Sequence, residues 1–318
     1  MTKCNFIFKN LVFLVLTFVL INFYTNTSKA APAQLPHTDS LCSASPITQN
    51  TVNTAEDACE MQPTTQKVKF FKLDLCKTMP TAPTTAAAAI RTTCSDVFTN
   101  AAGSEVSIAK GVGSPLDGTF NDPPYGTYTW AYIEISPTLK YTASATFAGN
   151  RKHPGGTVTT SGNAICWTIN ATSFNAYGST EGIPNPRVIN CGNALGTIGE
   201  ESLFLNSFFS GADDGADSRS TAASFLATNG SLVEAYLVDN TGKLVISGTA
   251  GNIVPDTANN VSKLIVLMPV NLTITPDTTG YNIKWNNTRG IKPYFSLSTD
   301  QIVDMFGIAY FDFDLTVF

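Results

Sequence analysis

The strongest constraint on the fold is an alternation of apolar and polar residues in short segments separated by turn-forming residues. In residues 140–147 every second position is apolar, and within the predicted strand at residues 308–318 apolar residues alternate with aspartate and threonine from residue 311 to residue 317. Because successive side chains of a β-strand point to opposite faces, this pattern predicts half-buried strands. The same reasoning predicts strands at residues 67–76, 106–108, 127–135, 234–238, 243–247, 264–275 and 281–285.

Turn residues predict how some of these strands pair. Residues 239–242 (DNTG) predict a β-hairpin within residues 234–248. Residues 277–280 (DTTG) predict a second hairpin, which would join residues 264–275 to residues 281–285. In both cases the reason is that Asp, Asn and Gly favour tight turns between antiparallel strands.

Two local features depart from regular strands. The apolar positions of residues 67–76 change parity between Phe70 and Phe71, which predicts a β-bulge. Ser298 and Gln301 match a helix capping box, so residues 298–306 are predicted to form a short helix that ends at Gly307.

The overall pattern predicts an all-β fold of the antiparallel β-sandwich type with little helix. The ordered part of the chain exceeds the length of one typical sandwich, which is about 100 residues. We therefore expect two packed β-domains, an N-terminal sandwich at residues 56–150 and a C-terminal β-rich domain at residues 151–318. A single larger double sheet is the alternative.

Residues 1–30 have the three parts of a secretory signal peptide. Lys3 and Lys9 provide positive charge, residues 11–24 are apolar, and small residues at Ser28 and Ala30 fit a cleavage site. The alternative is a retained membrane anchor, but a helix of this apolar length spans only about 21 Å of a hydrocarbon core about 30 Å thick. We expect cleavage, no transmembrane span in the mature chain, and a polar leader at residues 31–55.

The cysteines agree with export. Of seven Cys, Cys4 would leave with the signal peptide and six would remain, and an even number in an exported chain predicts disulfides. A metal site is the alternative, but the chain has no C-x-x-C motif and no His near a Cys at ligand spacing. Six Cys allow 15 connectivities. The nearest-neighbour pattern among these would pair Cys42 with Cys59, Cys76 with Cys94, and Cys166 with Cys191.

Composition excludes several classes of function. The 318 residues include only 14% charged residues, with 19 Lys and Arg against 24 Asp and Glu, so we expect no nucleic-acid partner. Only His37 and His153 could serve a histidine-based mechanism, and both lie in polar or turn-like segments. The S-x-x-K match at Ser107 and Lys110 stands in a strand context without its companion motifs. We therefore expect a protein without catalytic activity.

Three groups of residues remain as candidate sites. Asp213, Asp214 and Asp217 lie in a glycine-rich loop that could bind Ca²⁺ or simply be solvated. Glu200 and Glu201 could serve glycan hydrolysis, although adjacent carboxylates point apart. Tyr128, Trp130 and Tyr132 share one face of a predicted strand, where they would form either a sugar-binding platform or a core.

The sequence thus predicts an exported, disulfide-stabilised, β-rich protein at the cell surface or in the periplasm, with a structural or adhesive role. The alternatives are a carbohydrate-binding module and a secreted hydrolase that uses carboxylates to cleave glycans. We expect no cofactor other than calcium. Other copies of the chain, pairing through edge strands, or surface glycans are the expected partners.

Overall fold

The computed structural model describes residues 33–34, 41–42, 46–47, 59–108, 114–174, 188–205, 208–210, 218–226, 231–245, 261–296, 299–308 and 312–318. These residues form strands, turns and loops without a helix, which confirms the predicted all-β, sandwich-type fold. Within them, no helix has the length and apolar character that crossing a membrane requires. The predicted signal peptide lies outside the described residues.

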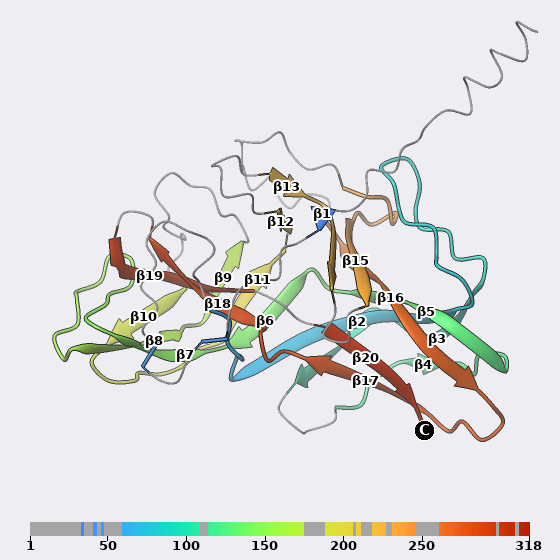
Figure 1. Cartoon of the computed structure of the whole chain (residues 1–318), viewed down its shortest axis with the longest axis horizontal. Helices are drawn as coiled ribbons and strands as arrows, with labels where there is room; N and C mark the ends of the chain where they lie inside the picture. The colour runs from blue at the N-terminus through green and yellow to red at the C-terminus, as the bar shows by residue number, and fades with distance from the viewer. Residues whose placement is uncertain are drawn as a thin grey trace, which may run out of the picture. The chain divides into compact units, whose positions relative to one another are not determined.

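Twenty strands make up the described part of the chain (Figure 1). They are β1 (Ala33–Gln34), β2 (Thr65–Cys76), β3 (Cys94–Ile108), β4 (Thr119–Phe120), β5 (Gly126–Ile135), β6 (Thr138–Thr142), β7 (Ser144–Ala148), β8 (Asn163–Thr168), β9 (Ala171–Phe174), β10 (Ile189–Gly192), β11 (Glu201–Phe204), β12 (Phe208–Ser210), β13 (Ser218–Ser220), β14 (Ala222–Leu226), β15 (Leu232–Val238), β16 (Lys263–Ile274), β17 (Tyr281–Asn286), β18 (Ile291–Ser296), β19 (Thr299–Ile308) and β20 (Asp312–Val317).

The largest sheet has the order β1-β14-β15-β16-β5-β2-β6-β11-β9, and β3 with β4 joins it through β2. Strand β2 organises this sheet, because it pairs with β3 along one edge and with β5 and then β6 along the other. Its pairing shifts register between Phe70 and Lys72, which confirms the β-bulge that the change of parity predicts.

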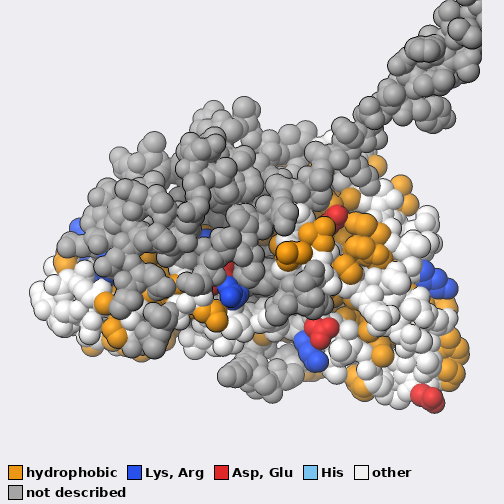
Figure 2. Space-filling model, viewed as in Figure 1, with side chains coloured by type: hydrophobic (Ala, Val, Ile, Leu, Met, Phe, Trp, Pro, Cys, Tyr) orange, Lys and Arg blue, Asp and Glu red, His pale blue; other side chains and the backbone are white. Residues whose placement is uncertain are grey.

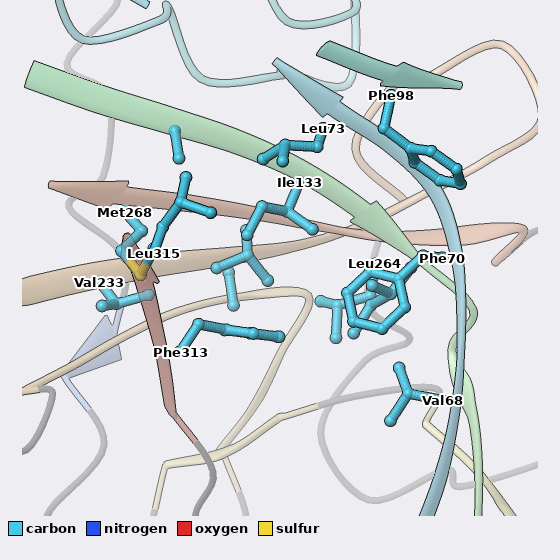
Figure 3. Close-up of a cluster of buried hydrophobic side chains, with 14 of the residues drawn as sticks. Val68, Phe70, Leu73, Phe98, Ile133, Val233, Leu264, Met268, Phe313 and Leu315 are labelled. Carbon is cyan, nitrogen blue, oxygen red and sulfur yellow. The ribbon is translucent and has the colours of Figure 1, made fainter. Parts of the chain in front are cut away.

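A first hydrophobic core lies between the large sheet and the two-stranded ribbon of β17 and β20 (Figure 3). Phe70 of β2 meets the ribbon directly, with ring centroids 6.3 Å from Trp285 and 6.4 Å from Phe313. Phe313 and Leu315 are buried in this core, whereas Asp314 between them is exposed. The alternation predicted for the last strand is therefore confirmed at these positions.

A second core lies among β6, β7, β8, β10 and the ribbon of β18 and β19. Phe147 of β7 stands at its centre, with ring centroids 5.7 Å from Phe295 and 6.4 Å from Phe306. Ile47 also belongs to this core and is only 5% exposed, because its backbone pairs with β7. Part of the predicted polar leader is thus built into the fold.

The centre of the large sheet is buried on both faces. The face opposite the first core carries a smaller apolar cluster that includes Tyr132, Tyr236 and Leu267. The loop at residues 77–93 covers this cluster with Ala82 and Ala89. Because both faces of the sheet are covered here, residues 131–135 of β5 and 264–268 of β16 are all buried, instead of alternating between buried and exposed positions.

Two predicted elements are wrong. A helix is predicted at residues 298–306, but residues 299–308 form strand β19, which pairs with β18. This pairing buries Val303 and Phe306 in the second core. Strands β16 and β17 do not form the hairpin predicted from residues 277–280. Both edges of β16 are already paired, with β15 and β5, so β17 pairs with the last strand, β20.

Two other predictions hold with a change of detail. The predicted strand at residues 140–147 divides at Ala143 into β6 and β7, which belong to different sheets. The turn at residues 239–242 forms as predicted, with Gly242 at a φ of 80° and a bridge between Val238 and Leu244. Residues 246–248 of that hairpin lie outside the described residues.

The predicted division into two β-domains stays a prediction. Strands from both sides of residue 150 pair with one another, as β5 does with β16 and β6 does with β11. Each of the two larger cores likewise includes residues from both sides.

Candidate functional site

Four charged side chains meet on the face of the large sheet that the loop at residues 77–93 covers. Strands β2 and β3 place Asp74 directly opposite Asp96, and Cys76 directly opposite Cys94. Lys72 shares the face of Asp74 because the two residues are two positions apart on β2. Arg91 comes from the end of the covering loop. We call Lys72, Asp74, Arg91 and Asp96 the Asp74 cluster.

Asp74 is the most buried member of the Asp74 cluster, with a side chain that is 0% exposed. Arg91 Nη1 donates a hydrogen bond to Asp74 Oδ2, and Lys72 Nζ lies 3.6 Å from Asp74 Oδ1. Burial and a hydrogen bond with Asp96 raise the pKa of the Asp74 carboxyl to about 7, against the opposing effect of Arg91 and Lys72. The pKa of Asp96 is lowered, first by its bond with Lys72 and then by Asp74.

An open pocket of about 450 Å³ borders the Asp74 cluster. It is lined by Asp74, Ala89, Ile90, Arg91, Thr92, Cys94 and Asp96. Asp96 is half exposed in this pocket, with 53% of its side chain accessible, whereas Asp74 forms the buried floor. Solvent therefore reaches one carboxyl group of the pair and not the other.

A chain of polar contacts extends from the Asp74 cluster across β5 to β16. The Arg91 guanidinium lies 4.7 Å from the centre of the Tyr132 ring, and the Tyr132 hydroxyl donates a 2.8 Å hydrogen bond to Glu134. Lys263 of β16 donates a hydrogen bond to the other oxygen of Glu134. Burial raises the pKa of the Tyr132 hydroxyl, which therefore stays protonated and acts as the donor.

This arrangement can hold and transfer a proton between two carboxyl groups. Two carboxyl groups can hydrogen-bond to each other only when one of them is protonated. The pKa of Asp74 is raised to about 7 and that of Asp96 is lowered, so below about pH 7 Asp74 is the carboxyl group that holds such a proton. Two cations already balance these carboxyl groups, and the described residues contain no group of three or more potential metal ligands.

The three aromatic residues predicted to share a strand face differ in environment. Tyr128 is 0% exposed in the first core, and its hydroxyl donates a 2.6 Å hydrogen bond to the Pro124 carbonyl. Tyr132 is 3% exposed in the smaller apolar cluster, against which the half-buried Trp130 packs. The core alternative accounts for Tyr128 and Tyr132, and a sugar contact at Trp130 stays a prediction.

Glu200 and Glu201 are not part of the Asp74 cluster. Glu201 of β11 is buried opposite Tyr141, and neighbouring Glu200 forms a 2.6 Å ion pair with Lys67. Asp213, Asp214 and Asp217 lie outside the described residues, so the calcium site stays a prediction.

All three expected disulfides are present. They join Cys42 to Cys59, Cys76 to Cys94, and Cys166 to Cys191, which is the nearest-neighbour pattern. The second and third join register partners of adjacent antiparallel strands. The polar positions in KLDLC at residues 72–76 and CSD at residues 94–96 could have indicated the Asp74 cluster, because they share one strand face with these cysteines.

No family model, curated protein or solved structure matches this chain.

Proposed function

We propose that this chain is an exported protein of the cell surface or periplasm with a structural or adhesive role and no catalytic activity. The observation that carries the proposal is the set of three disulfides, which join parts of the chain that also share its apolar cores. Disulfides form and persist in oxidising compartments and are rare where thiols are kept reduced. The signal-peptide pattern of residues 1–30 supports the same compartment.

The charge of the surface argues against a nucleic-acid partner. Charged side chains are few and scattered on the face shown in Figure 2, where the described residues form no continuous basic stripe. A mature chain without Lys3, Lys9 and Lys29 would carry 16 basic and 24 acidic residues, a net charge of −8. Such a surface would be repelled by anionic polymers.

The Asp74 cluster supports the non-catalytic part of the proposal. Asp74 holds a proton near neutral pH, but its side chain has no exposure and its second oxygen bonds Arg91. A general acid must reach the bond that it protonates, at about 3 Å or through one water molecule. The protonated carboxyl therefore acts within the fold rather than on an external substrate.

The proposal is tested by locating the native protein with a labelled antibody in intact and in permeabilised cells. A surface protein is labelled in intact cells, and a periplasmic protein is labelled once the outer barrier alone is opened. A known cytosolic protein serves as the control for unintended permeabilisation. A pool that is labelled only together with the cytosolic control would contradict export.

A screen of the purified chain against a panel of glycans separates the remaining roles. Turnover of any glycan would contradict the non-catalytic assignment. Binding without turnover that is lost in Trp130→Ala would favour the carbohydrate-binding alternative over a purely structural role.

A further inference from the structure

Three side chains of the Asp74 cluster bring an amine, a carboxylate and a second carboxyl group into contact. Lys72 Nζ lies 2.7 Å from Asp96 Oδ1 and 3.6 Å from Asp74 Oδ1, and Asp74 stands directly opposite Asp96 on the paired strands β2 and β3. We propose that Lys72 and Asp96 become joined by an intramolecular amide bond, an isopeptide, with Asp74 as the catalytic residue that moves the proton.

The backbone holds the three groups in place before any reaction. Asp74 and Asp96 are register partners on β2 and β3, and the disulfide between Cys76 and Cys94 ties the same two strands two residues away. Arg91 fixes the far oxygen of Asp74. Fixing two reacting groups at contact distance can raise their effective concentration to about 10⁵ M or more, which favours amide formation between groups that would not combine in dilute solution.

The proton needed for the reaction is present on the neighbouring carboxyl group. Attack by an amine on a carboxylate is slow unless the carboxylate oxygen is protonated or accepts a strong hydrogen bond. Asp74 faces Asp96 across the paired strands and can supply that proton, because its raised pKa of about 7 leaves about half of it protonated at pH 7 while the pKa of Asp96 is lowered.

The step balances without an oxidant, a reductant or a second substrate. Protonated Asp74 first gives its proton to one oxygen of Asp96 and takes one in return from the Lys72 ammonium. The neutral Lys72 nitrogen then bonds to Cγ of Asp96. Asp74 gives its new proton to the same oxygen and takes a second one from the nitrogen, so it ends protonated as it began. One C–O bond of Asp96 breaks, and that oxygen leaves as water, while the nitrogen has lost two protons in total.

The environment of Lys72 and Asp96 favours both the attack of the amine and the release of water. The Lys72 side chain is 16% exposed, so it has little freedom to move away from Asp96. Asp96 opens into the pocket beside the Asp74 cluster, which gives the released water a path to solvent. The bond would cross-link β2 and β3 next to their disulfide.

A second ion pair of nearly the same length serves as an internal control. Lys140 Nζ lies 2.8 Å from Glu105 Oε2, and the charged groups that act on Glu105 are lysines rather than another carboxyl group. If contact between amine and carboxylate were sufficient, both pairs would react. The proposal requires the third carboxyl group, so only the pair of Lys72 and Asp96 becomes cross-linked.

The experiment is peptide mapping by mass spectrometry of the full chain after denaturation, reduction and alkylation. We expect a branched tryptic peptide that joins Lys72 to Asp96 and is lighter than its two linear parts by one water molecule, with no cleavage after Lys72. Lys140 and Glu105 should appear in ordinary linear peptides. Complete cleavage after Lys72, or a second branched peptide at Lys140 and Glu105, would overturn the proposal.

Two variants test the assigned roles. Lys72→Arg keeps the positive charge but lacks the primary amine, so the branched peptide should be absent. Asp74→Asn keeps the shape of the side chain but cannot transfer the proton, and we expect cross-linking to slow by about a hundredfold or more. Each variant is first checked for an intact Cys76–Cys94 disulfide and a wild-type circular dichroism spectrum. An Asp74→Asn chain that is folded and cross-links at the wild-type rate would overturn the role of Asp74.

Discussion

Asp304 of β19 is a carboxyl group that is only 4% exposed, and burial raises its pKa from 3.8 to about 7. Between about pH 4 and pH 7 the unfolded chain has lost this proton while the folded chain still holds it. The contribution of Asp304 to the free energy of unfolding therefore falls as the pH rises through this window. Above about pH 7 the folded protein must hold a charged group in its interior.

We expect Asp304→Asn to stabilise the protein at pH 8 and to have little effect at pH 4. A pKa shift of about three units, at about 1.4 kcal/mol each, sets an upper limit of roughly 4 kcal/mol for the gain. Urea unfolding of the variant and the wild type across this pH range measures the difference. The exposed Asp314→Asn is the matched control, and a gain for Asp304→Asn that does not grow with pH would contradict the assignment.

The burial of Ile47 in the second core can be tested by substitution. Its side chain is buried in the second core, and its backbone N–H donates a 2.7 Å hydrogen bond to the Thr146 carbonyl. Ile47→Ala should lower the free energy of unfolding by about 2–5 kcal/mol, because it leaves a cavity beside Phe147. Leu41→Ala is the control, since Leu41 is 47% exposed. Equal unfolding midpoints for the two variants would show that Ile47 is not part of the core.

Single positions that follow a simple local rule can be predicted from the sequence, whereas positions whose role depends on tertiary contacts cannot. The change of parity at Phe70 predicts the bulge because a shift of one residue moves every following side chain to the other face. Ile47 stands alone among Ser, Thr, Gln and Asn, so no periodicity could indicate its burial. Arg91 likewise lies in a loop, and only the folded chain brings it to Asp74.

At the scale of elements, the loop at residues 77–93 acts as a cover for one face of the large sheet. Its alanines pack on the smaller apolar cluster, and Arg91 ties its end to Asp74 and to the Tyr132 ring. The disulfide between Cys76 and Cys94 closes the loop at its base. Backbone hydrogen bonds also pair Lys77 with Thr93 and Thr81 with Ile90 within the loop, and the Leu244 N–H donates one to the Thr84 carbonyl.

We expect Arg91→Ala to lower the free energy of unfolding by about 2 kcal/mol, because Asp74 loses its partner while staying buried. Part of this loss should return in the double variant with Asp74→Asn, because the amide is neutral at every pH and removes the cost of burying an ionisable carboxyl group. Lys284→Ala is the control, since the ion pair of Lys284 with Asp314 is largely exposed. Thermal unfolding measures all four proteins, and a double variant less stable than Arg91→Ala alone would contradict this account.

The errors in predicting elements have one physical cause. Whether neighbouring strands pair depends on which strand edges remain free, and that is a property of the whole sheet. Strand β16 has both edges occupied, so the DTTG turn at residues 277–280 leads to a strand that pairs elsewhere. The capping-box pattern near residue 301 is local, whereas the pairing of β19 with β18 and its place in the second core are not. Tertiary contacts override such weak local signals.

At the scale of the whole molecule, the disulfides differ in how far solvent can reach them. Cys166 and Cys191 are 0% and 8% exposed in the second core, whereas Cys42 and Cys94 are each half-buried. Reduction requires a reductant to reach a sulfur atom or the chain to open locally. We therefore expect the bond between Cys166 and Cys191 to be the last one reduced.

Stepwise reduction of the folded protein with a small phosphine, followed by alkylation and mass spectrometry, gives this order. The same measurement in urea is the control, because unfolding exposes all three bonds and should abolish the difference in rate. Early loss of the Cys166–Cys191 bond in the folded protein would contradict the burial of the second core.

We propose that oxidised, cross-linked strands hold this all-β chain together outside the reducing cytosol. Disulfide mapping of the native protein tests it most directly, with free thiols blocked at the moment of cell lysis. We expect no blocked thiol in the mature chain and three linked peptide pairs, Cys42 with Cys59, Cys76 with Cys94, and Cys166 with Cys191. Recovery of these six cysteines as blocked thiols, or in other pairs, would contradict it.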